Sequence, residues 1–261
     1  MQSRRLLKFT TQCEKFILSA KEKQSLDIED FTSVRHKDIC VMTDPFPHVV
    51  IENFFKPDIY RGLVEQFARV QARGLIDEKK PNDKSRFHLF DIEYDGYVFT
   101  PPPVLHADNP LRIFYSLEWN HFFSKLFHQF TTFETSLSFH HHPKGDQTGF
   151  VHNDFVDKYF RQDIRLPNGV RPIVVDGKGG SPRKRIIAIL FYLNNDGWKE
   201  GDGGETGIYG ADKMTLVKKV PPFNNSLLAF RVSQASMHAF QANLKERNSL
   251  VQWLHVPEEM L

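Results

Sequence analysis

The sequence predicts an α+β protein, mainly β, in which helices of the N-terminal half support a jelly roll. Three observations carry this prediction. Of the 261 residues, 40% are hydrophobic and 24 are Phe, which is enough apolar material for a large core. Helical periods come first along the chain, and many short β-type runs follow. Only two cysteines occur, so packing rather than a disulfide framework or a cysteine zinc site must hold the fold.

The charge balance excludes several classes of protein. Lys and Arg number 34 against 32 Asp and Glu, a formal net charge of +2. A disordered chain needs low hydrophobicity and high net charge, and a nucleic-acid coat needs a strong basic excess. No apolar run approaches the roughly 18 residues of a membrane span. We therefore expect a soluble, cytoplasmic protein without a membrane or nucleic-acid partner. The oligomeric state stays open.

The N-terminal half divides at a change of character near residue 45. Residues 1–44 lack a single period and are interpreted as an N-terminal extension, and residues 45–261 as the main domain. His48–Glu52 is typical of a strand. A helix is expected from Pro57 onward, because its apolar residues recur at spacings of four, four and three and Pro suits a first turn. These residues are Ile59, Leu63, Phe67 and Val70.

The middle of the chain alternates polar and aromatic segments. Residues 75–85 are polar and predict a loop, and a strand is expected over Arg86–Tyr94. Pro101–Pro103 indicates a stiff connection. Leu111–Phe130 is rich in Phe and Leu, which predicts a core helix broken near Trp119.

Short β-type runs dominate from residue 135 onward. Ile186–Asn194 is nearly continuous and apolar, which is typical of a buried strand. The other expected strands are Thr135–His141, Met214–Val220, Ser226–Val232, His238–Ala242 and Asn248–Val256. Residues 155–185 do not fit this scheme, because they are polar and contain four glycines and three prolines. A loop of this length inside a compact domain is usually a functional lid or a disordered segment, and we interpret this one as an insert that serves as a lid.

Two of the twelve histidines stand out by their neighbours. His152 and Asp154 lie at i and i+2, so an extended segment points both side chains to one face. Facial iron sites take two His and one carboxylate and leave coordination positions open. His238, at the start of a predicted strand, is the best third ligand. We therefore predict that His152, Asp154 and His238 form a metal site.

A second pair follows on the last predicted strand. Arg247 and Ser249 are again at i and i+2 and can face the same interior. A cation beside a hydroxyl suits a bound carboxylate. The alternative for Arg247 is a surface ion pair. The order of the two His, the Asp and the Arg along the chain favours a site.

Taken together, these motifs resemble the prolyl 4-hydroxylase-like branch of the 2-oxoglutarate- and Fe(II)-dependent dioxygenases. The resemblance covers about residues 45–257, and its individual pieces gain specificity from their order and spacing. They are Pro45–Pro57, Gly149–Asp154, Phe191–Trp198, Gly203–Thr206, Asn225–Phe230, His238 and Arg247–Trp253.

This resemblance implies a double-stranded β-helix, which is a jelly roll with iron at its open end. It implies that His152, Asp154 and His238 are both the catalytic residues and the ligands of Fe(II). The implied cosubstrates are 2-oxoglutarate and O2, with ascorbate as an allowed reductant. Related halogenases carry a small residue at the place of Asp154. The carboxylate therefore indicates hydroxylation, with desaturation and cyclisation left open.

The resemblance also suggests how 2-oxoglutarate is held. Arg247 would bind its distal carboxylate, and Tyr192 and Ser249 are further candidate contacts. Relatives often carry a tyrosine about ten residues before the first ligand, where this chain has His140–His142. On a strand, His140 and His142 point one way and His141 the other. We interpret all three as pocket-lining or surface residues.

The expected function is oxidation of an unactivated C–H bond in a small molecule, such as an amino acid or a secondary metabolite. A protein-residue hydroxylase of the prolyl type is the alternative within the enzyme class. A non-catalytic jelly-roll binding protein is the alternative of another class. The basic run Arg183–Arg185 could attract an acidic substrate, but we interpret it as a solvated basic turn.

Overall fold

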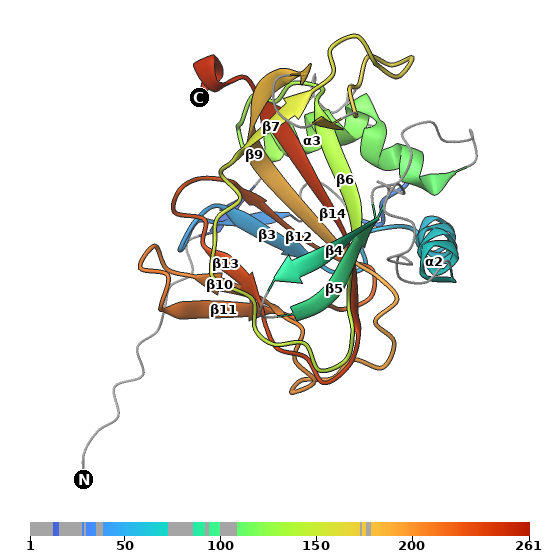
Figure 1. Cartoon of the computed structure of the whole chain (residues 1–261), viewed down its shortest axis with the longest axis vertical. Helices are drawn as coiled ribbons and strands as arrows, with labels where there is room; N and C mark the ends of the chain where they lie inside the picture. The colour runs from blue at the N-terminus through green and yellow to red at the C-terminus, as the bar shows by residue number, and fades with distance from the viewer. Residues whose placement is uncertain are drawn as a thin grey trace.

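The fold is a jelly roll supported by helices, as the sequence predicts (Figure 1). The structure is a computed structural model that describes residues 13–15, 28, 30–34, 39–72, 86–91, 94–99, 109–172, 174–175 and 179–261. Within these ranges the strands form one large and one small sheet, and every pairing between strands is antiparallel.

The large sheet has the strand order β1-β2-β3-β12-β9-β14-β6-β5-β4. Its strands are β1 (Cys13–Lys15), β2 (Cys40–Met42), β3 (His48–Ile51), β12 (Ser226–Arg231), β9 (Ser181–Tyr192), β14 (Arg247–Val256), β6 (Thr135–His142), β5 (Tyr94–Phe99) and β4 (Arg86–Asp91). Off this path, β7 (Asp157–Phe160) pairs with β9, and β8 (Val174–Val175) pairs with β7. The small sheet has the order β11-β10-β13, with β11 (Leu216–Val220), β10 (Thr206–Tyr209) and β13 (His238–Phe240).

The helices cover one face of the large sheet. They are α2 (Pro57–Ala72), the 3-10 helix η2 (Pro110–Tyr115) and α3 (Leu117–Leu126), with a short 3-10 helix η4 (Glu258–Met260) near the end of the chain. The expected helix after Pro57 is confirmed. The break expected near Trp119 lies at Ser116, whose hydroxyl accepts a hydrogen bond from the Trp119 backbone N–H at 3.2 Å and so caps α3.

The central strands have two different faces. On β9, Ile187, Ile189 and Phe191 belong to the helix-covered core. Ala188, Leu190 and Tyr192 belong to a second core inside the jelly roll. This alternation follows from the two-residue period of a strand. The polar candidate residues therefore belong on the inner face.

The expected strands of the C-terminal half are confirmed within one or two residues at most ends. Strand β9 begins five residues before the predicted Ile186, and β10 was not predicted. Strand β10 is only four residues long and follows two glycines, Gly203 and Gly204, which read as a turn.

The segment 155–185, expected as a loop, contains β7, β8 and the first residues of β9. Its polar sequence forms strands because its charges are paired. Arg183 lies 3.2 Å from Glu134, and Lys184 lies 2.7 Å from Asp157. The basic run is therefore part of a strand, so the expectation of a solvated basic turn is wrong. A role for 155–185 as a lid stays a prediction.

Part of the predicted N-terminal extension contributes to the domain. Strand β2 pairs with β3, and Ile28, Ile39 and Val41 are buried in the helix-covered core. A boundary at residue 44 stays a prediction. The loop expected over 75–85 and the connection at Pro101–Pro103 lie outside the described residues.

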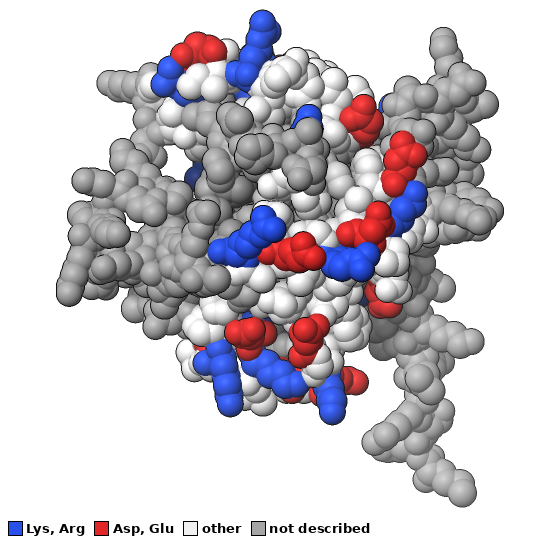
Figure 2. Space-filling view, turned by 90° about the vertical axis from the view of Figure 1, so that its right-hand side faces the viewer, with Lys and Arg blue, Asp and Glu red and all other residues white. Residues whose placement is uncertain are grey.

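The face of the molecule in Figure 2 shows Lys and Arg side chains interspersed with Asp and Glu. This mixture agrees with the net charge of +2. In the part of the chain that the structure describes, every helix is too short or too polar to span a bilayer.

Candidate metal centre

His152, Asp154 and His238 come together at one end of the jelly roll. Their ligand atoms all lie within 4.8 Å of one another. Two backbone hydrogen bonds bring the segments together: His152 N–H donates to His238 O at 3.0 Å, and His238 N–H donates to His152 O at 2.9 Å. His152 and Asp154, which share one face of an extended segment, therefore lie beside His238, the first residue of β13.

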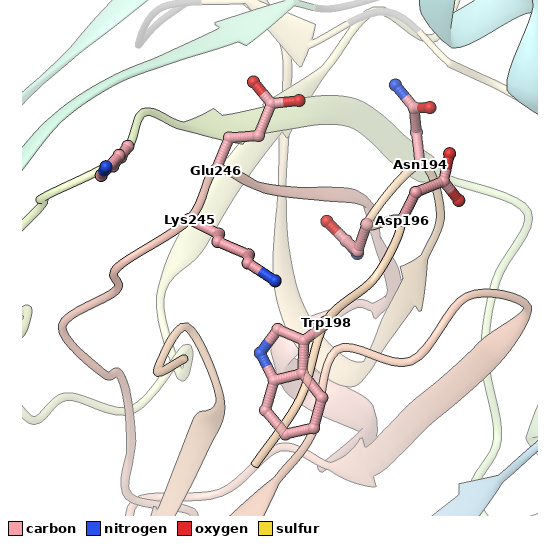
Figure 3. Close-up of a pocket in the computed structure, with 7 residues that line it drawn as sticks. Asn194, Asp196, Trp198, Lys245 and Glu246 are labelled. Atoms are coloured by element: carbon pink, nitrogen blue, oxygen red, sulfur yellow. The ribbon is translucent and has the colours of Figure 1, made fainter. Parts of the chain in front are cut away.

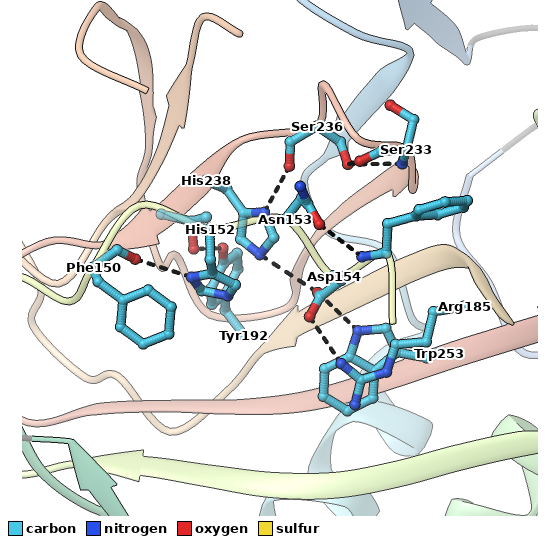
Figure 4. A network of polar contacts seen from close by, with 12 residues as sticks. Phe150, His152, Asn153, Asp154, Arg185, Tyr192, Ser233, Ser236, His238 and Trp253 are labelled. Carbon is cyan, nitrogen blue, oxygen red and sulfur yellow. Dashed lines mark hydrogen bonds and ion pairs between the residues drawn. The ribbon is translucent and has the colours of Figure 1, made fainter. Parts of the chain in front are cut away.

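Both imidazoles are oriented by backbone carbonyls (Figure 4). Nδ1 of His152 lies 2.9 Å from Phe150 O, and Nδ1 of His238 lies 3.0 Å from Ser236 O. A carbonyl can only accept, so these partners assign the proton to Nδ1. In the neutral imidazole, Nε2 then carries a lone pair toward the cluster, which is the tautomer that a metal ligand needs. Burial, followed by the charge of His238, lowers the pKa of His152 and favours its neutral form.

The carboxylate of Asp154 is buried and held by several donors. Arg185 Nη1 donates to Oδ1 at 2.9 Å, and Trp253 Nε1 donates to Oδ2 at 2.8 Å. His238 Nε2 lies 3.5 Å from Oδ2. Burial alone would raise the pKa of Asp154, but the His238 contact and the charge of Arg185 hold it well below its usual range. Asp154 is therefore an anion.

This donor set fits a divalent metal ion. Two neutral imidazoles and one carboxylate are the facial set of non-haem Fe(II) sites, which leaves positions for other ligands. The outer contacts of all three side chains are already made by protein groups, as is usual where a metal site is preorganised.

Arg247 lies on the same inner face, at the start of β14. Its Nη1 donates to Ser249 Oγ at 3.0 Å, and its Nη2 donates to Thr206 Oγ1 at 3.2 Å. Its guanidinium carbon lies 5.0 Å from the centre of the Tyr192 ring, and the Tyr192 hydroxyl is 2.7 Å from Thr206 Oγ1. Burial raises the pKa of Tyr192, so its hydroxyl stays protonated. Arg247, Ser249 and Tyr192 thus form one polar cluster.

Gly204, two residues before Thr206, leaves room for the side chain of Arg247. Gly204 has a φ of +77°, and a Cβ there would lie 3.3 Å from the Arg247 Cβ. A larger residue would be strained in this backbone conformation and would crowd Arg247.

His140 and His142 also face this cluster. In the pairing of β6 with β14, His140 is opposite Ser249 and His142 is opposite Arg247. Burial, together with neighbouring histidine and Arg247 charges, holds the pKa of both imidazoles well below the ordinary value. The His142 ring stacks on Phe240 at 4.0 Å, and its Nδ1 lies 3.3 Å from Asp146 Oδ2. The two therefore line the interior as neutral groups.

Comparison with known proteins gives this arrangement a family. Residues 137–255, which contain all of these side chains, match the model of the 2OG-Fe(II) oxygenase superfamily. This match supports a 2OG-Fe(II) oxygenase. The oxygenase is therefore a dioxygenase that uses Fe(II), 2-oxoglutarate and O2. No protein of curated function matches the sequence.

Solved structures share the fold of the oxygenase at low sequence identity. A prolyl-4-hydroxylase from Pseudomonas putida is 18% identical with a TM-score of 0.53, over 80% of this chain and 91% of that chain. A prolyl hydroxylase from Trichoplax adhaerens, solved with a hypoxia inducible factor peptide, is 15% identical with a TM-score of 0.55, over 80% and 83%. The jelly roll is thus of the prolyl-hydroxylase type.

Three residues of the site did not emerge as candidates from the sequence. Thr206 ends the Gly203–Thr206 motif and Trp253 ends the Arg247–Trp253 motif, so their positions in those motifs were a usable signal. Arg185 gave no such signal, because a run of three basic residues is usually solvated. Its contact with Asp154 depends on strand geometry that the sequence does not display.

A separate pocket of about 370 Å³ lies where the turns before β14 and after β9 meet (Figure 3). Asn194, Asp196, Trp198, Lys245 and Glu246 are among the residues that line it. Lys245 Nζ is 2.9 Å from Asp202 and donates to Gly197 O at 2.6 Å, so this cation braces the turn. The groups that could hold a metal ion converge at the His–Asp–His cluster, whose residues do not line this pocket.

Proposed function

We propose that the oxygenase binds Fe(II) through His152, Asp154 and His238 and hydroxylates an unactivated C–H bond. The observation that supports this proposal is the convergence of two Nε2 atoms and one buried carboxylate within 4.8 Å. Fe(II) with 2-oxoglutarate supplies the oxidation of the C–H bond by O2. The protein supplies orientation and a dry surround.

The cluster around Arg247 is the proposed site of the distal carboxylate of 2-oxoglutarate. Its guanidinium is buried and already oriented by Ser249 and Thr206, so little side-chain entropy is lost when it binds an anion. Tyr192 holds Thr206 in place through its hydroxyl. The proposed role of Tyr192 and Ser249 is therefore to orient the carboxylate as well as the arginine.

Asp154 supports hydroxylation over halogenation. Its carboxylate fills the place that related halogenases leave to a small residue, and it is held there by two donors. Desaturation and cyclisation use the same three ligands and differ in the substrate that is presented to them.

The proposed substrate is a small molecule such as an amino acid or a secondary metabolite, as the sequence suggests. A protein residue is the second candidate, and two observations favour it. The two solved structures compared above are prolyl hydroxylases, one of them bound to a peptide. Phe150 is 52% exposed and its ring lies 4.7 Å from the His152 ring, so an apolar side chain lies at the surface beside a proposed ligand.

The activity is tested by succinate formation from 2-oxoglutarate in the presence of Fe(II), O2 and candidate substrates. Asp154→Ala should abolish succinate formation. Asp157→Ala is the matched control, because Asp157 lies three residues away and pairs with Lys184 at the surface. Equal loss in both variants, or none in either, would contradict the proposed ligand set.

Arg247→Ala tests the cosubstrate site in the same assay. We expect the concentration of 2-oxoglutarate needed for half-maximal rate to rise by at least about tenfold, because a charge-assisted pair is lost from a buried site. An unchanged requirement would remove Arg247 from the site.

The substrate class is tested by comparing two panels in the succinate assay. One panel holds free amino acids and small metabolites, and the other holds peptides that contain proline. Acceleration by the first panel alone supports the small-molecule proposal, whereas acceleration by peptides alone supports the second candidate.

A further inference from the structure

Both oxygens of the Asp154 carboxylate are engaged by protein donors of different kinds. Arg185 Nη1 occupies Oδ1 at 2.9 Å. Oδ2 accepts from Trp253 Nε1 at 2.8 Å and is also the oxygen that faces His238 Nε2, at 3.5 Å. Only Oδ2 is thus shared with the imidazole cluster.

The two donors, Arg185 and Trp253, also contact each other. The guanidinium carbon of Arg185 lies 3.7 Å from the centre of the Trp253 ring, so the cation stacks on the indole whose N–H holds the other oxygen (Figure 4). The Arg185 side chain is 13% exposed. A planar guanidinium stacked on an aromatic face has little freedom to leave its carboxylate.

A β-bulge turns Arg185 toward the site. Along β9 and β14, Ile187 pairs with Leu254, but Arg185 pairs with His255, so the register shifts between them. Ile186 and Ile187 both belong to the helix-covered core as a result. If the same residues formed a regular strand without this bulge, Arg185 would point to the core face together with Ile187 and Ile189. Bulges near functional sites often re-aim a side chain in this way.

The neighbouring cations are used elsewhere. Arg183 pairs with Glu134 at 3.2 Å, and Lys184 pairs with Asp157 at 2.7 Å. Of the three basic residues in this run, Arg185 is the one that contacts Asp154. The run thus distributes its charges over three different acids instead of forming one basic surface.

We propose that Arg185 is a positioning residue that keeps Asp154 a one-oxygen ligand. By holding Oδ1, it leaves Oδ2 for the metal and keeps the second oxygen from taking a coordination position that 2-oxoglutarate needs. This inference rests on the proposed function of the His152–Asp154–His238 cluster. It adds to that proposal a residue on a different strand that controls access of the cosubstrate.

The test is Arg185→Met, which keeps an apolar chain over Trp253 and removes the donor and the charge. The protein is loaded with Co(II), whose visible spectrum reports coordination, and is titrated with 2-oxoglutarate without O2. We expect Co(II) to bind the variant at least as tightly as the wild type, because a competing cation has been removed. The affinity of the Co(II)-loaded protein for 2-oxoglutarate should fall by about tenfold or more.

Arg183→Met is the matched control, because it removes a neighbouring arginine on the same strand that pairs with Glu134. Its cosubstrate affinity should equal that of the wild type. Arg185→Lys should restore 2-oxoglutarate binding to within about threefold of the wild type, because an ammonium group can still hold Oδ1. Should Arg185→Met not fold, Arg185→Gln is measured by the same two titrations.

Two outcomes would overturn the inference. Wild-type affinity for 2-oxoglutarate in Arg185→Met would show that Arg185 has no part in cosubstrate binding. Loss of Co(II) binding together with a lower melting temperature would show a structural role alone. If the wild type itself binds no Co(II), the proposed metal centre fails instead, so the two failures are distinguishable.

Discussion

The two faces of β9 differ in what holds them and in how much a single residue matters. Phe191 points into the helix-covered core, where its ring lies 4.9 Å from Phe55 in an edge-on contact. Tyr192, the next residue, points into the jelly roll, where its hydroxyl meets Thr206. One face depends on apolar volume, which many sequences can supply, and the other depends on particular polar atoms. A substitution at Phe191 should therefore change mainly the stability of the fold, whereas a substitution at the adjacent Tyr192 should change mainly the chemistry of the site.

The largest expected effect is on the inner face. His238→Ala should lower activity by more than the roughly 10–100-fold that loss of an outer-shell partner costs, because a proposed ligand is removed. Succinate formation and Co(II) titration measure the effect. Retained Co(II) affinity in a folded variant would contradict the role of His238.

The core face should respond in stability. Phe191→Ala should lower the free energy of unfolding by about 3–5 kcal/mol, because a fully buried aromatic ring is removed and a cavity remains. Urea unfolding measures this loss. The affinity of the folded fraction for Co(II) should not change, and a parallel loss of metal binding would break the separation of the two faces.

His255 predicts a pH dependence of stability. Burial, followed by the Arg185 charge, lowers the pKa of His255 from 6.5 to about 3, and its Nδ1 lies 3.0 Å from Glu134 O. Below pH 6.5 the imidazole of the unfolded chain binds a proton, whereas the imidazole of the folded chain stays neutral until about pH 3. The free energy of unfolding is therefore highest above pH 6.5 and falls as the pH drops toward 3. The slope is up to about 1.4 kcal/mol per pH unit.

His255→Leu should make this slope shallower by the contribution of one proton, which is up to about 1.4 kcal/mol per pH unit. This holds whatever the effect of the substitution on the free energy of unfolding at pH 8. Urea unfolding between pH 4 and 8 gives the comparison. Identical slopes for the variant and the wild type would show that His255 titrates in the folded protein as it does in the unfolded chain.

The smallest expected effect is that of Tyr192→Phe. The variant keeps the ring and loses the hydroxyl that meets Thr206, so stability should change by only about 1 kcal/mol. The affinity of the Co(II)-loaded protein for 2-oxoglutarate should fall by roughly fivefold, which corresponds to a similar free energy. Isothermal titration measures it, and an unchanged affinity would remove Tyr192 from the cosubstrate site.

The pattern of apolar residues was sufficient to predict most of the fold. The apolar run at Ile186–Asn194 and the helical spacing after Pro57 predict β9 and α2, because each satisfies the period of its element over many residues. Strands β7 and β10 were missed for different reasons. The first is charged and depends on ion pairs with distant residues, and the second is four residues long between turns.

For the candidate site, the residues close in sequence were easier to find than their partners. His152 and Asp154 share a face through local spacing, and the expected third member, His238, lies beside them in the structure. Arg185 could not be predicted, because a register shift against β14 sets its direction. A bulge depends on the pairing of two strands, which the local sequence does not reveal.

The most direct measurement is the visible spectrum after Fe(II) and 2-oxoglutarate are added without O2. A metal-to-ligand charge-transfer band should appear with the wild type and be absent from His152→Ala and Asp154→Ala, with Asp157→Ala retaining it. Absence of the band from folded wild-type protein, or its persistence in Asp154→Ala, would contradict a metal centre built from His152, Asp154 and His238.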